Sequence, residues 1–170
     1  LIDYDALMRS AKECRPRIIV SGTSAYPRAI DFRRIGKIAK AVGAYHVADI
    51  SHIAGLIATG FHESPFPYAD VVTTTTHKTL RGPRGALLMV TQKGLKKDPE
   101  LAEKIDKAVF PGLQGGPHDN QTAAIAVALK EASEPAFKKY AKQIVLNAKA
   151  LANELIKNRL GPGTYALAYI

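Results

Sequence analysis

The chain has 170 residues, of which 24 are Lys or Arg and 15 are Asp or Glu, giving a net charge of +9. A hydrophobic fraction of 46% is ordinary for a globular protein, and this length can bury the core of one domain with part of a second. No apolar run is long enough to span a membrane, and no charged-then-apolar signal segment opens the chain. These features argue against a membrane partner.

The positive charge raises the question of nucleic-acid binding. Many lysines lie in a polar stretch over residues 93–107, and others lie on a long amphipathic pattern from residue 137 onward. Solvated helix faces explain both groups, and no recognisable nucleic-acid motif accompanies them. We therefore expect no nucleic-acid partner.

The cysteine content and the chain ends bear on location and completeness. The single cysteine, Cys14, excludes internal disulfides and favours a reducing, cytoplasmic location. The sequence begins with Leu1 instead of Met, and residues 165–170 resemble a strand cut short. We expect an internal piece of a longer protein.

The predicted elements alternate between helix and strand. In chain order they are a helix over 3–13, a strand over 17–20, a helix over 31–42, strands over 45–48, 71–74 and 86–90, and helices over 120–131 and 137–155. Asp31 can cap the second helix and Gly43 can end it. The strands are short and apolar, as expected when helices cover both faces of a sheet. This order predicts an α/β layer fold with a βαβ unit.

The long final helix suggests a domain boundary. It leaves the α/β region near Pro135, continues to about residue 160, and is followed by a Gly-Pro-Gly segment. We predict a large domain over 1–135, a linking helix over 136–160, and the start of a smaller domain over 161–170.

The most informative motif is TTTTHK at residues 73–78, which follows a buried strand directly. Hydroxyls, an imidazole and an amine in one run make little sense as packing. A lysine in desolvated surroundings is a usable nucleophile, above all toward the aldehyde of pyridoxal phosphate. The competing interpretation is a solvated lysine in a Thr-rich turn.

Two further groups fall at the same edge of the predicted sheet, where ligands of open α/β folds bind. Asp49 and His52 follow the second strand, and Ser24 follows the first. A carboxylate at a strand end can pair with a pyridinium nitrogen and keep it protonated. Alternatively, Asp49 caps the next turn and His52 is a core histidine. A metal site lacks the remaining ligands at any recognisable spacing.

A Gly-rich turn, PGLQGGP at residues 111–117, is the third candidate. Glycines let backbone N–H groups approach an anion such as phosphate, although an ordinary turn has the same composition. The chain has neither GxGxxG after a strand nor GxxxxGK[ST], which weighs against nucleotide folds.

Three segments resemble serine hydroxymethyltransferases: VVTTTTHKTLRGPRG at 71–85, ADISHIAGL at 48–56 and VFPGLQGGPH at 109–118. The similarity runs from about residue 2 to 159. It implies a three-layer α/β/α large domain of a fold-type I pyridoxal-phosphate enzyme with a mostly parallel mixed sheet. Residues 161–170 depart from the family pattern.

The resemblance also implies roles for individual residues. Lys78 matches the lysine that binds pyridoxal 5'-phosphate covalently, and Asp49 matches the partner of the ring nitrogen. Thr75 matches a threonine that assists exchange of the lysine for the substrate amine, and His77 matches the histidine that influences reaction specificity. His52 and Ser24 match residues at the cofactor's phenolic oxygen, and Arg84 matches an arginine that supports the site. Gly115 and Gly116 match a turn that offers its backbone to the cofactor phosphate of a neighbouring subunit.

The function implied by the resemblance is the reversible conversion of L-serine and tetrahydrofolate to glycine and 5,10-methylenetetrahydrofolate. The implied assembly is a homodimer, or a dimer of dimers, with shared active sites. Since other site residues of the family would lie outside this chain, we expect the fragment alone to be inactive. The alternatives are a folate-independent aldolase acting on threonine or another β-hydroxy amino acid, and a non-catalytic truncated dimerisation remnant.

Overall fold

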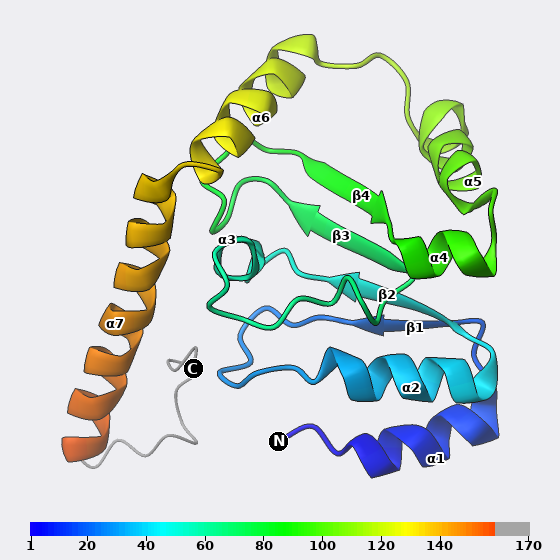
Figure 1. The fold of residues 1–170 in the computed structure, drawn as a ribbon, viewed down its shortest axis with the longest axis horizontal. Helices are drawn as coiled ribbons and strands as arrows, with labels where there is room; N and C mark the ends of the chain where they lie inside the picture. The colour runs from blue at the N-terminus through cyan, green and yellow to red at the C-terminus, as the bar shows by residue number, and fades with distance from the viewer. Residues whose placement is uncertain (159–170) are drawn as a thin grey trace.

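Four strands form one mixed sheet in the order β1-β2-β3-β4 (Figure 1). The computed structural model describes residues 1–158, so the strand predicted over 165–170 and the start of a smaller domain predicted over 161–170 lie outside the described residues. β1 (Ile18–Ser21), β2 (Tyr45–Asp49) and β3 (Val71–Thr75) are parallel neighbours, and β4 (Ala86–Val90) pairs antiparallel with β3. The predicted α/β class with a mostly parallel sheet is confirmed.

α2 (Phe32–Val42) packs on β1 and β2, and α1 (Tyr4–Cys14) packs against α2 on the side away from the strands (Figure 1). The sequence signals act as expected, because Asp31 Oδ1 accepts a hydrogen bond from Arg34 N at 2.8 Å and caps α2. Gly43 ends α2 in the left-handed region at φ 76°. The apolar stripe of α2 is buried against the sheet: Phe32, Ile35, Ile38 and Ala39.

The other helices lie after the second strand. They are α3 (Ala54–Ala58), α4 (Gln92–Lys97), α5 (Leu101–Lys107), the π-helical η1 (Ala108–Leu113), α6 (Asp119–Ala132) and α7 (Pro135–Lys157). The predicted break before the long helix is present, because α6 ends at Ala132 and α7 begins at Pro135. None of the helices within residues 1–158 combines the length and apolarity needed to cross a bilayer.

The second face of the sheet is less covered than the short apolar strands led us to expect. Ile19 and Ser21 are buried toward α2, whereas their neighbours Ile18 and Val20 are 54% and 68% exposed. Leu88 of β4 is 51% exposed. Side chains alternate along a strand, so within the described residues the helical cover lies on one face at these edge strands.

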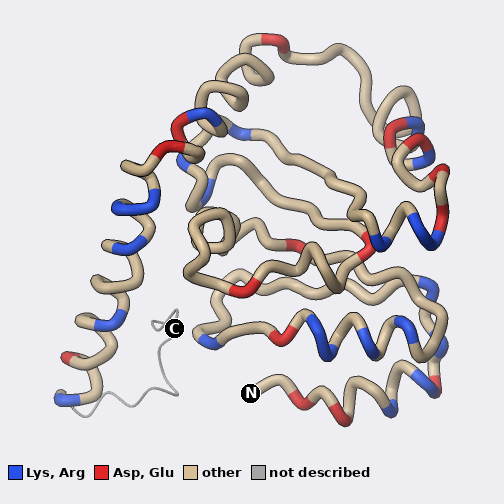
Figure 2. Tube along the Cα trace, in the orientation of Figure 1, with Lys and Arg blue, Asp and Glu red and all other residues tan. Residues whose placement is uncertain are grey.

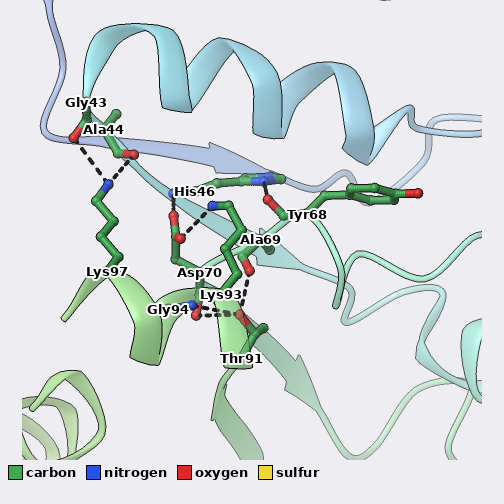
Figure 3. Close-up of polar contacts among 10 residues, drawn as sticks. All are labelled: Gly43, Ala44, His46, Tyr68, Ala69, Asp70, Thr91, Lys93, Gly94 and Lys97. Carbon is green, nitrogen blue, oxygen red and sulfur yellow. Dashed lines mark hydrogen bonds and ion pairs between the residues drawn. The ribbon is translucent and has the colours of Figure 1, made fainter. Parts of the chain in front are cut away.

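A buried polar network fastens the start of β2 and β3 to α4 (Figure 3). Asp70 is fully buried, accepts a hydrogen bond from His46 N at 2.7 Å, and pairs with Lys93 Nζ at 2.5 Å. The His46 ring spans 3.2 Å from Nδ1 to the Tyr68 carbonyl and 2.8 Å from Nε2 to Ser21 Oγ. Since a carbonyl only accepts, Nδ1 donates and the neutral ring accepts from Ser21 at Nε2.

Burial is the largest influence on the pKa of His46 and lowers it, and the positive charge of Lys93 lowers it further. The hydrogen bond to the Tyr68 carbonyl and the negative charge of Asp70 act in the opposite direction, but the pKa remains below its usual value. The network therefore holds a neutral histidine between the sheet and α2.

Candidate active site

The carboxyl ends of β1, β2 and β3 meet at one edge of the sheet because these strands are parallel. Asp49 is the last residue of β2 and pairs in register with Thr73 of β3. Thr75 is the last residue of β3, and Lys78 follows in the turn. The topology thus gathers the chemistry predicted from two separate motifs at one place.

A continuous series of hydrogen bonds links the carboxylate to the amine. Asp49 Oδ1 accepts from Ser51 N at 2.9 Å and from Ser51 Oγ at 2.6 Å. Ser51 Oγ in turn accepts from Thr75 N at 3.0 Å, and Thr75 Oγ1 accepts from Lys78 Nζ at 2.9 Å. Three of the predicted site residues, Asp49, Thr75 and Lys78, are therefore held together through Ser51.

The end of β1 packs directly on the end of β2. A Cβ on Gly22 would overlap the Asp49 carbonyl oxygen and lie 2.9 Å from Asp49 Cβ. Gly22 also has φ 153°, a conformation that other residues rarely adopt. This glycine allows the backbone after β1 to approach Asp49. Ser24, two residues later, is exposed and makes no hydrogen bond within residues 1–158.

His77 and Arg84 approach one another across the turn, with 3.4 Å between Arg84 NH1 and His77 Nε2. His77 Nδ1 is buried and has no hydrogen-bond partner among the described residues. A buried polar atom without a partner is rare in folded proteins and marks a place where a ligand can donate or accept. His52 is half-buried and makes no hydrogen bond to any described residue.

The turn that carries Lys78 is fixed by two threonines on either side of it. Thr76 Oγ1 donates to the Pro83 carbonyl at 2.6 Å, and Thr79 Oγ1 accepts from Gly55 N at 2.9 Å. A Cβ on Gly55 would lie 2.8 Å from the Thr79 carbonyl oxygen, so this glycine lets α3 reach the turn. These contacts hold the backbone around Lys78 on both sides.

Ser51 and Thr79 belong to the site although neither was among the predicted site residues. Ser51 lies between Asp49 and His52 in the same motif, and Thr79 directly follows Lys78, so proximity to the motifs is the only sequence signal. Their partners are 24 residues distant in the chain, which no local pattern reveals.

The Gly-rich turn lies apart from this cluster in the described chain. A Cβ on Gly115 or on Gly116 would meet no atom within 4 Å, and both residues are exposed. Gly116 has φ 43°, in the left-handed region. The structure thus brings Asp49, Thr75 and Lys78 together but does not join Gly115 or Gly116 to them.

Chemically, the edge combines an amine, a carboxylate with a free oxygen, and an imidazole with an unpartnered nitrogen. Within residues 1–158, Asp49 Oδ2 has no hydrogen-bond partner. No group of three or more His, Cys, Asp or Glu residues in this range is placed to hold a metal ion. The arrangement is suited to binding a cationic nitrogen beside a nucleophilic amine.

Comparisons with known proteins agree with these motifs. A family model described as "Serine hydroxymethyltransferase" matches residues 1–161. A "Serine hydroxymethyltransferase" of Desulfotalea psychrophila is 58% identical over 157 residues, which are 92% of this chain and 35% of that protein. One of Prochlorococcus marinus is 57% identical over 157 residues, which are 92% of this chain and 37% of that protein.

The resemblance noted in the three segments is therefore confirmed over nearly the whole chain. The chain spans about a third of the length of these relatives, with 35% and 37% covered. The match includes the strand-end carboxylate, the lysine turn and the Gly-rich turn, all of which lie within residues 1–161. The chain belongs to the serine hydroxymethyltransferase family.

Proposed function

We propose that the complete protein interconverts L-serine and glycine, with tetrahydrofolate carrying the one-carbon unit and pyridoxal 5'-phosphate as cofactor. In the forward direction the products are glycine and 5,10-methylenetetrahydrofolate. Membership of the family supports the reaction, and the Asp49–Ser51–Thr75–Lys78 series of hydrogen bonds is the observation that carries the assignment of residues.

The residues at the sheet edge fit this cofactor. A pyridinium nitrogen needs an anionic acceptor, and among residues 1–158 Asp49 Oδ2 has no hydrogen-bond partner while Oδ1 is held by Ser51. An aldehyde needs an amine, and the only described hydrogen bond of Lys78 Nζ is to Thr75 Oγ1. The buried Nδ1 of His77 is an unpartnered polar atom beside this lysine.

Asp49 would hold the proton on the ring nitrogen. Ser51 donates two hydrogen bonds to one carboxylate oxygen and so fixes the orientation of the other. A fixed anion next to the ring nitrogen favours its charged form. When bound, the cofactor supplies an electron sink for the bond that breaks between Cα and Cβ of serine.

Lys78 would hold the cofactor covalently, and Thr75 would orient its amine. The Thr75 hydroxyl accepts from Lys78 Nζ, which directs the nitrogen lone pair and keeps the amine at the strand end. Thr75 N is itself bound by Ser51 Oγ, so the orientation is tied to Asp49. We propose His77 and Arg84 as neighbours that set reaction specificity and support the site, and His52 and Ser24 as contacts of the phenolic oxygen.

Gly115 and Gly116 are proposed to serve the phosphate of a partner subunit's cofactor. Their isolation within the described chain supports a role outside it, because nothing fills the space beside either glycine. This proposal includes a homodimer, or a dimer of dimers, with shared active sites.

The attachment point of the cofactor provides the direct test. The complete protein is loaded with pyridoxal 5'-phosphate, reduced with borohydride and digested, and the modified peptide is identified by mass spectrometry. We expect the modification on Lys78, and a modification on any other lysine would overturn the assignment. Lys93, which is engaged by Asp70, is the internal control and should stay unmodified.

The substrate is tested separately by the folate dependence of serine cleavage. Conversion of serine to glycine that requires tetrahydrofolate supports the proposed reaction. Folate-independent cleavage of threonine at a higher rate would instead identify a β-hydroxy amino acid aldolase. If the complete protein binds the cofactor on Lys78 but catalyses neither reaction, its role is non-catalytic.

A further inference from the structure

A groove of about 330 Å³ opens between α2, the segment before β3, and α4. Its surface is mainly apolar, and four of the residues that line it have cationic side chains: Arg33, Lys37, Lys40 and Lys93. None of them belongs to the proposed active site. Lys93 follows β4 and pairs with Asp70, which directly precedes β3, whereas Lys78 follows the end of β3. The groove therefore lies at the opposite edge of the sheet from Lys78.

Three of the cations share one face of α2. Arg33, Lys37 and Lys40 occupy positions i, i+4 and i+7, which fall on one side of a helix. Figure 2 shows basic residues along α2 and no acidic residue within it. All three are exposed, and neither Lys37 nor Lys40 forms an ion pair within residues 1–158. Like charges at this spacing repel each other, and a bound anion would relieve that repulsion.

The floor of the groove is built by close packing. A Cβ on Gly36 would lie 2.6 Å from the Tyr68 carbonyl oxygen, so this glycine lets α2 lie directly on the segment that carries Tyr68. Arg33 stacks over the Tyr68 ring at 5.3 Å and donates to its hydroxyl from Nε at 3.2 Å and from NH2 at 2.9 Å. The guanidinium is thereby oriented, and NH1 has no partner among the described residues.

Acidic groups near the groove do not neutralise it. Asp70 is fully buried and already holds Lys93 and His46 N. Glu63 and Asp31 act on Arg33 only through longer-range attraction. Within residues 1–158, the face of α2 therefore keeps the charges of Lys37 and Lys40 without compensation.

We propose that this groove binds a small anion that carries at least two linked phosphate groups. Residues 33 and 40 are about 10 Å apart along the axis of α2, because seven steps each advance by about 1.5 Å. A single phosphate can contact only neighbouring cations of this row, whereas a short chain of phosphates contacts more of them at once. The guanidinium of Arg33 lies over one side of the Tyr68 ring, 5.3 Å from its centroid, which leaves less aromatic surface for stacking a base and disfavours single-stranded nucleic acid.

The experiment uses inorganic tripolyphosphate as the probe and isothermal titration calorimetry of the complete protein at 0.15 M salt. The double variant Lys37→Gln/Lys40→Gln removes two uncompensated charges while leaving the floor of the groove intact. We expect the dissociation constant for tripolyphosphate to rise by about ten-fold or more, and orthophosphate to bind much more weakly than tripolyphosphate. The matched control is Lys138→Gln/Lys142→Gln on α7, which removes two exposed charges elsewhere and should leave the affinity unchanged.

Three outcomes would overturn the proposal. These are the absence of tripolyphosphate binding, an equal loss in both double variants, and a single-stranded RNA oligonucleotide that competes and binds more tightly through the same lysines. The amount of pyridoxal phosphate held by each variant is measured in parallel. Normal cofactor content in Lys37→Gln/Lys40→Gln keeps this test independent of the proposed catalytic function.

Discussion

Gly22 packs against Asp49 so closely that a methyl group on it would overlap the Asp49 carbonyl oxygen and lie 2.9 Å from Asp49 Cβ. Gly22 follows β1 and Asp49 ends β2, so the contact joins two strand ends that the sequence separates by a helix. The position of the carboxylate thus depends on a residue that has no chemistry of its own.

Replacing Gly22 by Ala should displace Asp49. Overpacking combined with an unsuitable φ is expected to lower the free energy of unfolding by about 2 kcal/mol or more, measured by urea denaturation. Cofactor affinity should fall as well, because the carboxylate moves. Gly43→Ala is the control: Gly43 also has positive φ, but a Cβ there meets nothing within 4 Å. It should lower stability and leave cofactor affinity intact, and equal cofactor affinity in both variants would contradict the positional role of Gly22.

Replacing Asp49 by Asn should separate cofactor binding from turnover. The amide keeps the shape of the side chain but removes the charge that holds the ring nitrogen protonated. We expect cofactor binding to persist in part, and turnover to fall by orders of magnitude, since a fixed charge at a developing charge contributes about 3 kcal/mol or more. Asp31→Asn, which preserves a helix cap, is the matched control. Near-normal turnover in Asp49→Asn would show that this carboxylate is structural.

Ser51→Ala should loosen the link between Asp49 and the lysine turn. The substitution removes the 2.6 Å hydrogen bond to Asp49 Oδ1 and leaves Thr75 N without its acceptor. A partly buried donor left without a partner costs up to about 1–3 kcal/mol, which thermal or urea unfolding would detect. Weaker cofactor binding should accompany it. The control is Ser133→Ala, which removes a hydrogen bond at an exposed helix end and should change the free energy of unfolding and the cofactor affinity little. Equal effects of the two substitutions would show that Ser51 does not link Asp49 to the lysine turn.

The pH dependence of stability should report on His46. Burial lowers its pKa in the folded state, so the unfolded chain, with a value near 6.5, binds more protons at mildly acidic pH. The stabilising contribution is present above the unfolded value and is lost as pH falls through the folded one. The slope for one such group is at most about 1.4 kcal/mol per pH unit.

Urea midpoints between pH 5 and pH 8 measure this slope. His46→Gln should flatten the part of the slope below pH 6.5 relative to the unsubstituted protein. A slope that persists in His46→Gln would assign the effect to other groups.

Mixed dimers test whether the Gly-rich turn serves a partner's site. Gly116→Val strains a left-handed position and adds bulk where backbone is proposed to approach phosphate, whereas Gly116→Asn adds bulk but tolerates this φ. Subunits with Gly116→Val are combined with subunits carrying Lys78→Ala. If the turn acts across the interface, both defects fall on one site and about half the activity should return in each mixed dimer. Mixing that restores no activity would rule out action in trans.

The sequence predicted most of the elements because their signals are local. Asp31 and Gly43 bounded α2 as expected, since a cap and a left-handed terminator act within one helical turn. The short helices α3, α4 and α5 were not predicted separately, because five to seven residues carry too little periodicity. The motif at 73–78 identified the lysine turn without any structure.

Tertiary structure alone decided how these parts meet. The sequence determined that a carboxylate, a threonine and a lysine each follow a strand, and through its motifs it determined the family. Only the parallel register of β2 and β3 placed Ser51 between Asp49 and Thr75, across 24 residues of chain. The same is true of the basic groove, where α2 meets Tyr68 and Lys93 through backbone packing at Gly36. Such contacts depend on strand order and register, which arise from burial of the whole sheet and which no short window of sequence encodes.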